Sequence, residues 1–312
     1  MRVTTLKAMK KLIVIFFRRI ARLLAVSDPL FKFLFKNESL ILCYHNVSSN
    51  PSVFELRFGL NHFPEVFGAQ LDFLGRYFRI EDPLQLGQSR DAGGVYLTFD
   101  DGFKGSLTEG VEIMQKNNVK SLHFLNMATV CDLEPYWVSA SIEIYGEDKY
   151  LDKPNQNWKQ EFNKNEENFH PQIVSMQELR KLENTSMVYL GNHLWNHYNV
   201  TKLSDDEVIE SYKQNENELL KFKNYSGFFA YPFGQPVTCY NNKSNKLIQS
   251  ISPKAIFTAF PSSNDISETK YFYRYSLSCN ATSDTDIKFE LIYQKIRSYF
   301  YRKFLEFKRE KV

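Results

Sequence analysis

The stretch Val95-Tyr96-Leu97-Thr98-Phe99, followed directly by Asp100-Asp101-Gly102, decides the fold of this chain. Its first part is rich in aromatic and β-branched residues, which favour a strand. Its second part, Asp-Asp-Gly, favours a turn. The sequence therefore predicts a buried strand that ends abruptly at a polar edge, where the chain bends and both carboxylates turn toward the same side.

Other short apolar runs end in polar residues in the same way. The predicted strands lie at 40–44, 121–126, 187–190, 228–231 and 255–259, and helical patterns lie between them at 64–78, 107–117, 177–183 and 204–222. This alternation predicts a parallel α/β architecture. Because barrels and open parallel sheets place their sites at the carboxyl ends of their strands, the polar residues after these strands form the candidate site.

The composition is that of an ordinary folded protein. The 312 residues are 43% hydrophobic and 24% charged, which is enough for one large domain or two small ones and excludes a wholly disordered chain. Thirteen glycines are too few for a glycine-rich class. The four cysteines at 43, 131, 239 and 279 lack CxxC spacing, which argues against a zinc knuckle, a redox motif or a dense disulfide framework.

The charge is unevenly distributed along the chain. Residues 1–27 contain seven basic residues and no acidic one, so the net charge of +3 leaves −4 for the rest. A basic excess confined to one arm does not indicate nucleic-acid binding, and we predict no nucleic-acid partner. We expect a basic N-terminal arm at 1–36, a catalytic domain at 37–285 with a polar insertion near 150–170, and a C-terminal helix at 286–312.

The arm is too polar to cross a membrane. Its apolar run from Leu12 to Phe17 is far shorter than the about 20 residues of a span, and it does not form a convincing cleavable signal peptide. On a helical wheel, one side is basic and the opposite side is apolar. The basic side holds Lys7, Lys11, Arg18 and Arg22, and the apolar side holds Leu6, Met9, Leu12, Ile13, Phe16, Phe17, Ile20, Leu23 and Leu24.

A basic amphipathic helix has two explanations. It binds an anionic membrane surface through residues 1–27, or it packs its apolar side on the domain and leaves its charges in water. We expect a cytoplasmic protein, and the first explanation would place it peripherally at the inner membrane face.

The acidic pair itself carries chemical information. Two adjacent carboxylates repel each other unless a cation or a proton lies between them. A divalent metal held by one carboxylate, with the other acting as a base, resolves this repulsion. The alternative is a structural turn before a helix.

A second motif, His193-Leu194-Trp195-Asn196-His197, follows a predicted strand and a glycine. Histidines at this spacing share one helical face or bracket a tight turn, and either geometry suits a first-row metal. The H-E-x-x-H glutamate is absent, which excludes that class of metalloprotease. An added aspartate would complete a two-histidine, one-carboxylate set. We expect both side chains to lie outside the core, and an ordinary surface turn remains the alternative.

The third motif is Phe229-Ala230-Tyr231-Pro232-Phe233-Gly234, in which a strand enters a tight turn. Such a turn exposes backbone N–H groups that can stabilise a developing oxyanion. By itself the motif is better explained as a simple structural turn.

In this order the three motifs, TFDDG, HxxxH and FAYPFG, resemble the polysaccharide deacetylases, the NodB-homology enzymes of carbohydrate esterase family 4. The resemblance covers roughly residues 40–280 and implies a distorted (β/α) barrel. It further implies that Asp100 is the catalytic base and that Asp101, His193 and His197 bind one divalent metal. Zinc suits this ligand set best, and nickel, cobalt or iron would also bind.

The chain departs from the usual family pattern, because no histidine follows position 197 to supply the late Leu-x-x-His acid. Leu42-Cys43-Tyr44-His45-Asn46-Val47 instead resembles the Y-H-x-V strand of the circularly rearranged, exopolysaccharide-modifying subgroup. His45 is then the acid, and we expect its ring within about 10 Å of the metal ligands on the substrate side. We also expect the Phe233 N–H to bind the oxyanion and Arg274 to orient Asp100.

The sequence thus predicts a metal-dependent hydrolase that removes N-acetyl groups from amino sugars of a poly- or oligosaccharide or a glycan precursor. Two alternatives remain: a deformylase or deacylase acting on a lipid-linked sugar, and an inactive carbohydrate-binding homologue. Tyr136, Trp137 and Trp158 either stack on sugar rings or pack within the domain.

Overall fold

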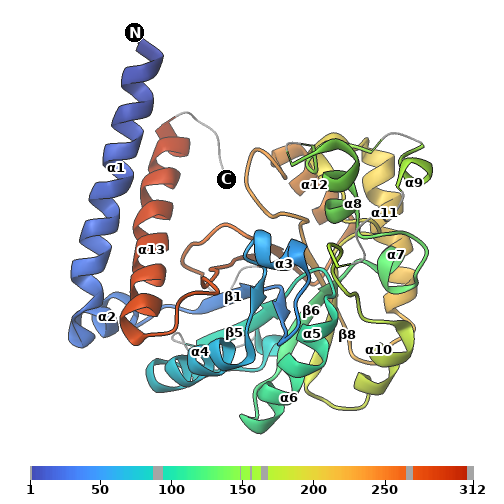
Figure 1. Ribbon diagram of the computed structural model, residues 1–312, viewed down its shortest axis with the longest axis horizontal. Helices are drawn as coiled ribbons and strands as arrows, with labels where there is room; N and C mark the ends of the chain where they lie inside the picture. The colour runs from blue at the N-terminus through green and yellow to red at the C-terminus, as the bar shows by residue number, and fades with distance from the viewer. Residues whose placement is uncertain are drawn as a thin grey trace.

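The computed structural model describes residues 2–86, 94–147, 149–154, 157–162, 168–264 and 270–307, with side chains assigned outside 2–11 and 304–307. The segments 155–156 and 163–167 of the predicted polar insertion lie outside the described residues. Around a central sheet the chain forms helices on both faces, and a separate helix pair stands along one edge (Figure 1).

The central sheet is parallel throughout, which confirms the predicted α/β class. β4 (Arg79–Ile80) pairs with the start of β5, outside the main strand order. The strands of that order are β1 (Leu40–Tyr44), β5 (Gly94–Phe99), β6 (Ser121–Leu125), β7 (Val188–Asn192), β8 (Tyr225–Ala230), β9 (Ala255–Thr258) and β10 (Tyr271–Tyr273).

The sheet nearly closes on itself into a distorted (β/α) barrel. Just beyond β10, Tyr275 forms an isolated parallel bridge with Leu42 of β1. The Tyr275 N–H donates to the Ile41 carbonyl at 2.8 Å, and the Tyr275 carbonyl accepts from Cys43 N–H at 2.7 Å. Closure brings the carboxyl ends of the strands together around one mouth. A small second sheet pairs β2 (Asn46–Val47) with β3 (Asn61–His62).

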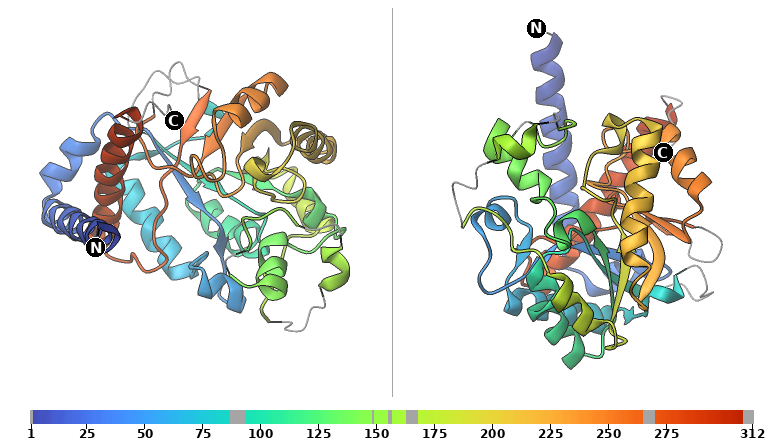
Figure 2. Two further views of the ribbon diagram at one scale, coloured as in Figure 1. Left: turned by 90° about the horizontal axis from the view of Figure 1, so that it is seen from above. Right: turned by 90° about the vertical axis from the view of Figure 1, so that its right-hand side faces the viewer.

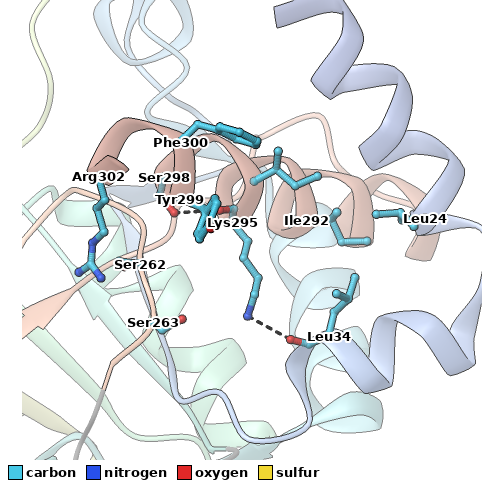
Figure 3. A pocket seen from close by; sticks show the side chains of 11 residues that line it. Leu24, Leu34, Ser262, Ser263, Ile292, Lys295, Ser298, Tyr299, Phe300 and Arg302 are labelled. Carbon is cyan, nitrogen blue, oxygen red and sulfur yellow. Dashed lines mark hydrogen bonds between the residues drawn. The ribbon is translucent and has the colours of Figure 1, made fainter. Parts of the chain in front are cut away.

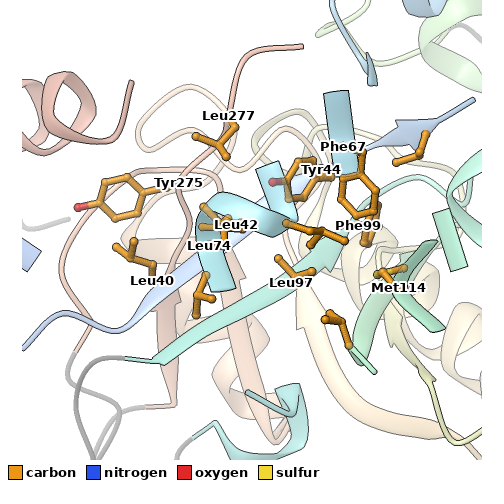
Figure 4. Close-up of a cluster of buried hydrophobic side chains, with 14 of the residues drawn as sticks. Leu40, Leu42, Tyr44, Phe67, Leu74, Leu97, Phe99, Met114, Tyr275 and Leu277 are labelled. Carbon is orange, nitrogen blue, oxygen red and sulfur yellow. The ribbon is translucent and has the colours of Figure 1, made fainter. Parts of the chain in front are cut away.

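The core packs between this sheet and the helices that cover it (Figure 4). Every residue of β5 is buried, as expected for a parallel strand covered on both faces. The rings of Tyr44, Phe67 and Phe99 contact one another with centroids 5.3–5.9 Å apart, linking β1, β5 and the helix α4 (Pro64–Tyr77). This packing fixes the ends of β1 and β5, which carry His45 and the acidic pair.

The remaining helices join the strands in the predicted alternation. The predicted helix at 107–117 is interrupted, because Thr108 leaves the helical region with φ −118° and ψ −88°. The elements are α3 (Val53–Arg57), η1 (Pro83–Gln85), α5 (Lys104–Leu107), α6 (Glu109–Lys116), α7 (Met127–Val130), α8 (Trp137–Tyr145), α9 (Trp158–Glu161), α10 (Met176–Leu182), η2 (Val200–Lys202), α11 (Asp205–Leu219) and α12 (Asn242–Ile251).

The N-terminal arm forms α1 (Arg2–Ala25) and α2 (Asp28–Phe35), and α1 lies antiparallel beside α13 (Asp284–Phe307) (Figures 1 and 2). The Phe17 ring stacks on Phe300 with centroids 4.5 Å apart, and Ala21 is fully buried. Part of the apolar side of the arm therefore packs on the protein itself. Within the described chain, no helix combines the length and apolarity needed to cross a bilayer.

Candidate active site

Asp100 and Asp101 lie buried at the mouth of the barrel, directly after β5. The chain bends sharply there, since Asp101 and Gly102 have φ of 72° and 75°. This left-handed backbone is costly for a residue with a side chain and tends to occur at functional sites. The bend turns the two carboxylates toward different partners.

Asp101 faces the two histidines of the HxxxH motif. Its Oδ1 atom lies 3.0 Å from His197 Nε2 and 3.4 Å from His193 Nε2. The motif forms a tight turn rather than a helix, with φ of 61° at Leu194 and 59° at His197. The expectation that both histidines lie outside the core was wrong, because their side chains are only 1% and 5% exposed. The Phe124 ring packs against His193, and the rings of Tyr136 and Phe233 pack against His197.

The donor atoms of this trio fit a metal ion. Among the described residues, Asp101 Oδ1 and His193 Nε2 are buried without a hydrogen-bond partner, and buried polar atoms rarely stay unsatisfied without a reason. The His193 Nδ1–H donates to the Ala230 carbonyl at 2.8 Å, which leaves the Nε2 lone pair free and orients it. Three ligand atoms lie within 4.8 Å of one another, as a two-histidine, one-carboxylate site requires.

The protonation states also suit metal binding. Burial would raise the pKa of Asp101, but the neighbouring histidines, His197 first, outweigh it and hold that pKa well below its ordinary value. Burial lowers the pKa of His197. An ionised carboxylate and a neutral imidazole are the forms that coordinate a cation.

Asp100 is bound by Arg274, which lies just after β10. The guanidinium donates to both carboxylate oxygens, at 2.7 and 2.8 Å, and is fully buried. Its Nε donates to the Thr258 carbonyl at 2.9 Å. Burial would raise the pKa of Asp100, but the Arg274 charge and then that of His193 outweigh it and lower that pKa. The sequence predicted this contact, and it keeps Asp100 ionised and fixed in orientation.

Asp100 also belongs to a second group of potential ligands, with Cys43 and His45. The Cys43 thiol lies 3.4 Å from Asp100 Oδ2, and burial raises the pKa of that thiol well above its ordinary value. A protonated thiol is a weak donor and a poor ligand. Because Arg274 already supplies a positive charge to this carboxylate, Asp101, His193 and His197 are the better candidate metal ligands.

His45 follows β1 and is more exposed than the groups around it. Its Nε2 atom lies 4.0 Å from Asp101 Oδ2, and its side chain is 30% exposed against 3% for Asp101. The ring therefore lies on the open side of the cluster, within the distance that the sequence predicts. Its role as an acid stays a prediction.

Phe233 lies at the tight turn after β8. Phe233 and Gly234 both have left-handed backbone, with φ of 61° and 58°. A Cβ on Gly234 would lie only 2.3 Å from the Ala259 nitrogen, so the turn requires glycine. The Phe233 ring packs against His197 with centroids 4.5 Å apart, which puts this turn beside the metal-ligand trio.

Tyr136 is a site residue whose role sequence reasoning missed. Its hydroxyl donates to Asp101 Oδ2 at 2.8 Å, so the two oxygens of Asp101 have separate partners. Tyr136 directly precedes α8 in a segment without a recognisable motif, so the sequence offered no signal for this contact. Of the two alternatives for Trp137 and Trp158, packing within the domain is the one observed, because both are buried and pack against each other with centroids 5.0 Å apart.

Replacing Tyr136 with phenylalanine should weaken metal binding by about 10–100-fold, because the hydroxyl holds the ligand Asp101 in place. The ring itself is retained, so packing against Phe54 and Phe103 is unchanged. Competition with a chelating dye measures the affinity. An affinity equal to that of the wild type would contradict a positioning role.

Solved structures of deacetylases share the fold of this chain, although no curated protein matches its sequence. The Streptococcus pyogenes deacetylase PplD in complex with acetate aligns with 81% of this chain at 16% identity and a TM-score of 0.55, and 98% of that chain is covered. IcaB from Ammonifex degensii aligns with the same share of this chain at the same identity and TM-score, and 97% of that chain is covered. A de-N-acetylase from Aggregatibacter actinomycetemcomitans aligns at 16% identity, with 81% of this chain and 99% of that chain covered and a TM-score of 0.50.

At these identities the structural matches show a shared fold. The sequence model of the polysaccharide deacetylase family matches residues 87–255, more than half of the chain. That span contains the acidic pair, both histidines of the HxxxH motif and the Phe233 turn. The chain therefore belongs to the polysaccharide deacetylases, a family of enzymes that hydrolyse N-acetyl amide bonds.

Proposed function

We propose that this protein is a metal-dependent hydrolase that removes N-acetyl groups from amino sugars of a saccharide chain or glycan precursor. The observation that carries the proposal is the arrangement at the barrel mouth. A buried Asp101–His193–His197 trio lies beside an Asp100 carboxylate fixed by Arg274, and the partly exposed His45 borders both.

The metal would be held by Asp101, His193 and His197, and we propose zinc, which favours nitrogen and oxygen ligands at a site with open positions. Such an ion, when bound, polarises the amide carbonyl and lowers the pKa of water. Asp101 contributes the negative charge of the site, and Tyr136 and Ala230 fix the orientation of Asp101 and His193.

The remaining groups divide the proton transfers between them. Asp100 accepts a proton from the water whose oxygen forms a bond to the amide carbon, and it can do so because it is ionised. The Phe233 N–H donates to the carbonyl oxygen as negative charge develops there. His45 donates a proton to the amide nitrogen as the carbon–nitrogen bond breaks, since an amide anion is a very poor leaving group. The products are acetate and a free amino sugar.

A second candidate substrate is an acylated or formylated sugar linked to a lipid. The observation that favours it is the exposed apolar surface of α1, which has no evident use in an enzyme acting only on soluble glycans. An inactive carbohydrate-binding protein is the poorest fit, because sugar binding requires neither the Asp100–Arg274 pair nor the trio of ligands.

Mass spectrometry of candidate glycans before and after incubation tests the proposed function. N-acetylated oligosaccharides should lose an acetyl mass, and the N-formylated analogues separate the two acyl groups. Addition of a chelator should stop the loss, and zinc should restore it. Unchanged masses for every substrate, with metal-loaded protein, would refute the proposal.

His45→Ala should keep metal and fold but lower the rate of amide hydrolysis by about 10²–10⁴-fold, the usual contribution of a general acid. The comparison substrate is an activated aryl acetate, whose leaving group departs without protonation. In the same variant, the rate of hydrolysis of this aryl acetate should fall far less. Equal losses on both substrates would show that His45 does not protonate the leaving group.

A further inference from the structure

The helix pair α1–α13, together with α2, carries most of the large apolar side chains that the described chain leaves exposed. The three helices lie along one edge of the barrel, and α1 projects beyond the rest of the molecule (Figures 1 and 2). The exposed residues are Leu12, Ile13, Val14, Ile15, Phe16, Leu23, Val26, Phe33, Tyr299 and Phe300. Contiguous exposed apolar surface of this kind marks an interaction site.

The apolar side of α1 is divided between two directions. Phe17, Ala21 and Ala25 turn toward the protein, where Ala21 and Ala25 are fully buried. Leu12, Phe16 and Leu23 are 66%, 59% and 76% exposed, and their spacing puts them on one face of the helix. We call these three residues the outer stripe. The two alternatives for the arm are therefore compatible, because α13 covers only part of its apolar surface.

Positive charge accompanies the outer stripe. Arg18, Arg19 and Arg22 are exposed, and none forms an ion pair with a described residue. Arg18 and Arg22 lie over the Phe289 ring of α13, at 5.4 and 5.1 Å from its centroid. These cations stay available to an anionic partner, because an aromatic ring does not neutralise their charge.

An apolar cavity borders the same helix pair (Figure 3). It has a volume of about 330 Å³ and lies between α13, the end of α1 and α2. Leu24, Ile292 and Phe300 supply apolar walls, and Arg302 adds a guanidinium. Apolar walls with a cation at one side fit the acyl chain and the headgroup phosphate of an anionic lipid.

We propose that the outer stripe and the exposed aromatic residues Tyr299 and Phe300 dock this protein on an anionic membrane. Apolar side chains enter the interface while the arginines contact lipid phosphates, the arrangement of an interfacial amphipathic helix. A second copy of the chain is a poorer partner, because residues 1–27 carry seven positive charges and no negative one. The proposal concerns binding and does not depend on the deacetylase activity.

The test compares two triple variants of the full-length protein by co-sedimentation with vesicles. Leu12→Ser, Phe16→Ser and Leu23→Ser together remove the outer stripe. Leu56→Ser, Leu133→Ser and Leu220→Ser together remove leucines that are 53%, 64% and 64% exposed elsewhere. The first variant should bind phosphatidylglycerol-containing vesicles at least about tenfold more weakly than the wild type, and the second should bind as the wild type does.

The contribution of charge is tested separately by replacing Arg18, Arg19 and Arg22 with glutamine. Binding should fall by about fivefold for each arginine removed, equivalent to ~1 kcal/mol per charge, and pure phosphatidylcholine vesicles should bind weakly. Equal vesicle binding by wild type and outer-stripe variant would overturn the proposal. The proposal would also be overturned if the wild type did not bind the vesicles but formed a dimer, and the outer-stripe variant did not form that dimer. Substitutions are preferable to deleting the arm, because deletion would also uncover α13.

Discussion

Asp100→Asn lowers the turnover of acetylated substrate by about 10²–10⁴-fold, the usual effect of losing a general base, while the protein keeps its metal. Asparagine retains the shape of the side chain but cannot accept the proton of the attacking water. Metal retention is expected because Asp101, and not Asp100, lies against both histidines. Turnover measured by acetate release, together with elemental analysis of the same sample, separates the two roles.

The structure adds a control to this experiment. Arg274 is fully buried and donates to both oxygens of Asp100. The substitution Asp100→Asn therefore leaves the Arg274 guanidinium without a counter-charge, which typically costs about 3–5 kcal/mol of stability. Thermal unfolding must therefore accompany the rate measurement. Arg274→Met leaves the base in place but unoriented, and it should share the loss of stability. If Asp100→Asn loses metal while Asp101→Asn keeps it, the assigned roles are reversed.

His193→Ala or His197→Ala removes tight metal binding and, with it, the hydrolysis of N-acetylated sugars. Each substitution takes one nitrogen from a trio whose remaining ligands cannot complete the site. In His193→Ala the Ala230 carbonyl also loses its donor, which adds about 1–3 kcal/mol of destabilisation. Metal content is measured by elemental analysis after dialysis, and circular dichroism checks the fold.

The matched control for this pair is His62→Ala. His62 is also a buried histidine, bound to the Leu277 carbonyl at 3.1 Å, but it lies outside the trio. The His62→Ala variant should lose stability and keep its metal. Wild-type metal content in both His193→Ala and His197→Ala would show that the metal site lies elsewhere.

The sequence was most informative where polar residues directly follow strands. Parallel strands bring their carboxyl ends to one mouth, so Asp100, Asp101, His193 and His45 could be placed together without coordinates. The depth of the site could not be predicted in this way. The two histidines are buried by aromatic rings from distant parts of the chain, Phe124, Tyr136 and Phe233, and contacts between distant residues leave no local pattern in the sequence.

Two contacts of the site depend on segments with weak signals. β10 has only three residues, too few to show a strand pattern, yet it positions Arg274 beside Asp100. Tyr136, which directly precedes α8, reaches Asp101 from a segment without a recognisable motif. In both cases the contact joins residues far apart in the chain, and single-sequence periodicity reports only local structure.

The pairing of α1 with α13 also sets an order of events during synthesis. The two helices are separated by the whole barrel, so at about 5–20 residues per second α13 leaves the ribosome roughly 15–50 s after α1. Throughout that interval Phe17 lacks the Phe300 ring on which it stacks, because α13 has not yet been made. The same delay holds for the barrel, since Tyr275 must be present before it can close against β1. A nascent chain thus presents a wider apolar face on α1 than the finished protein does.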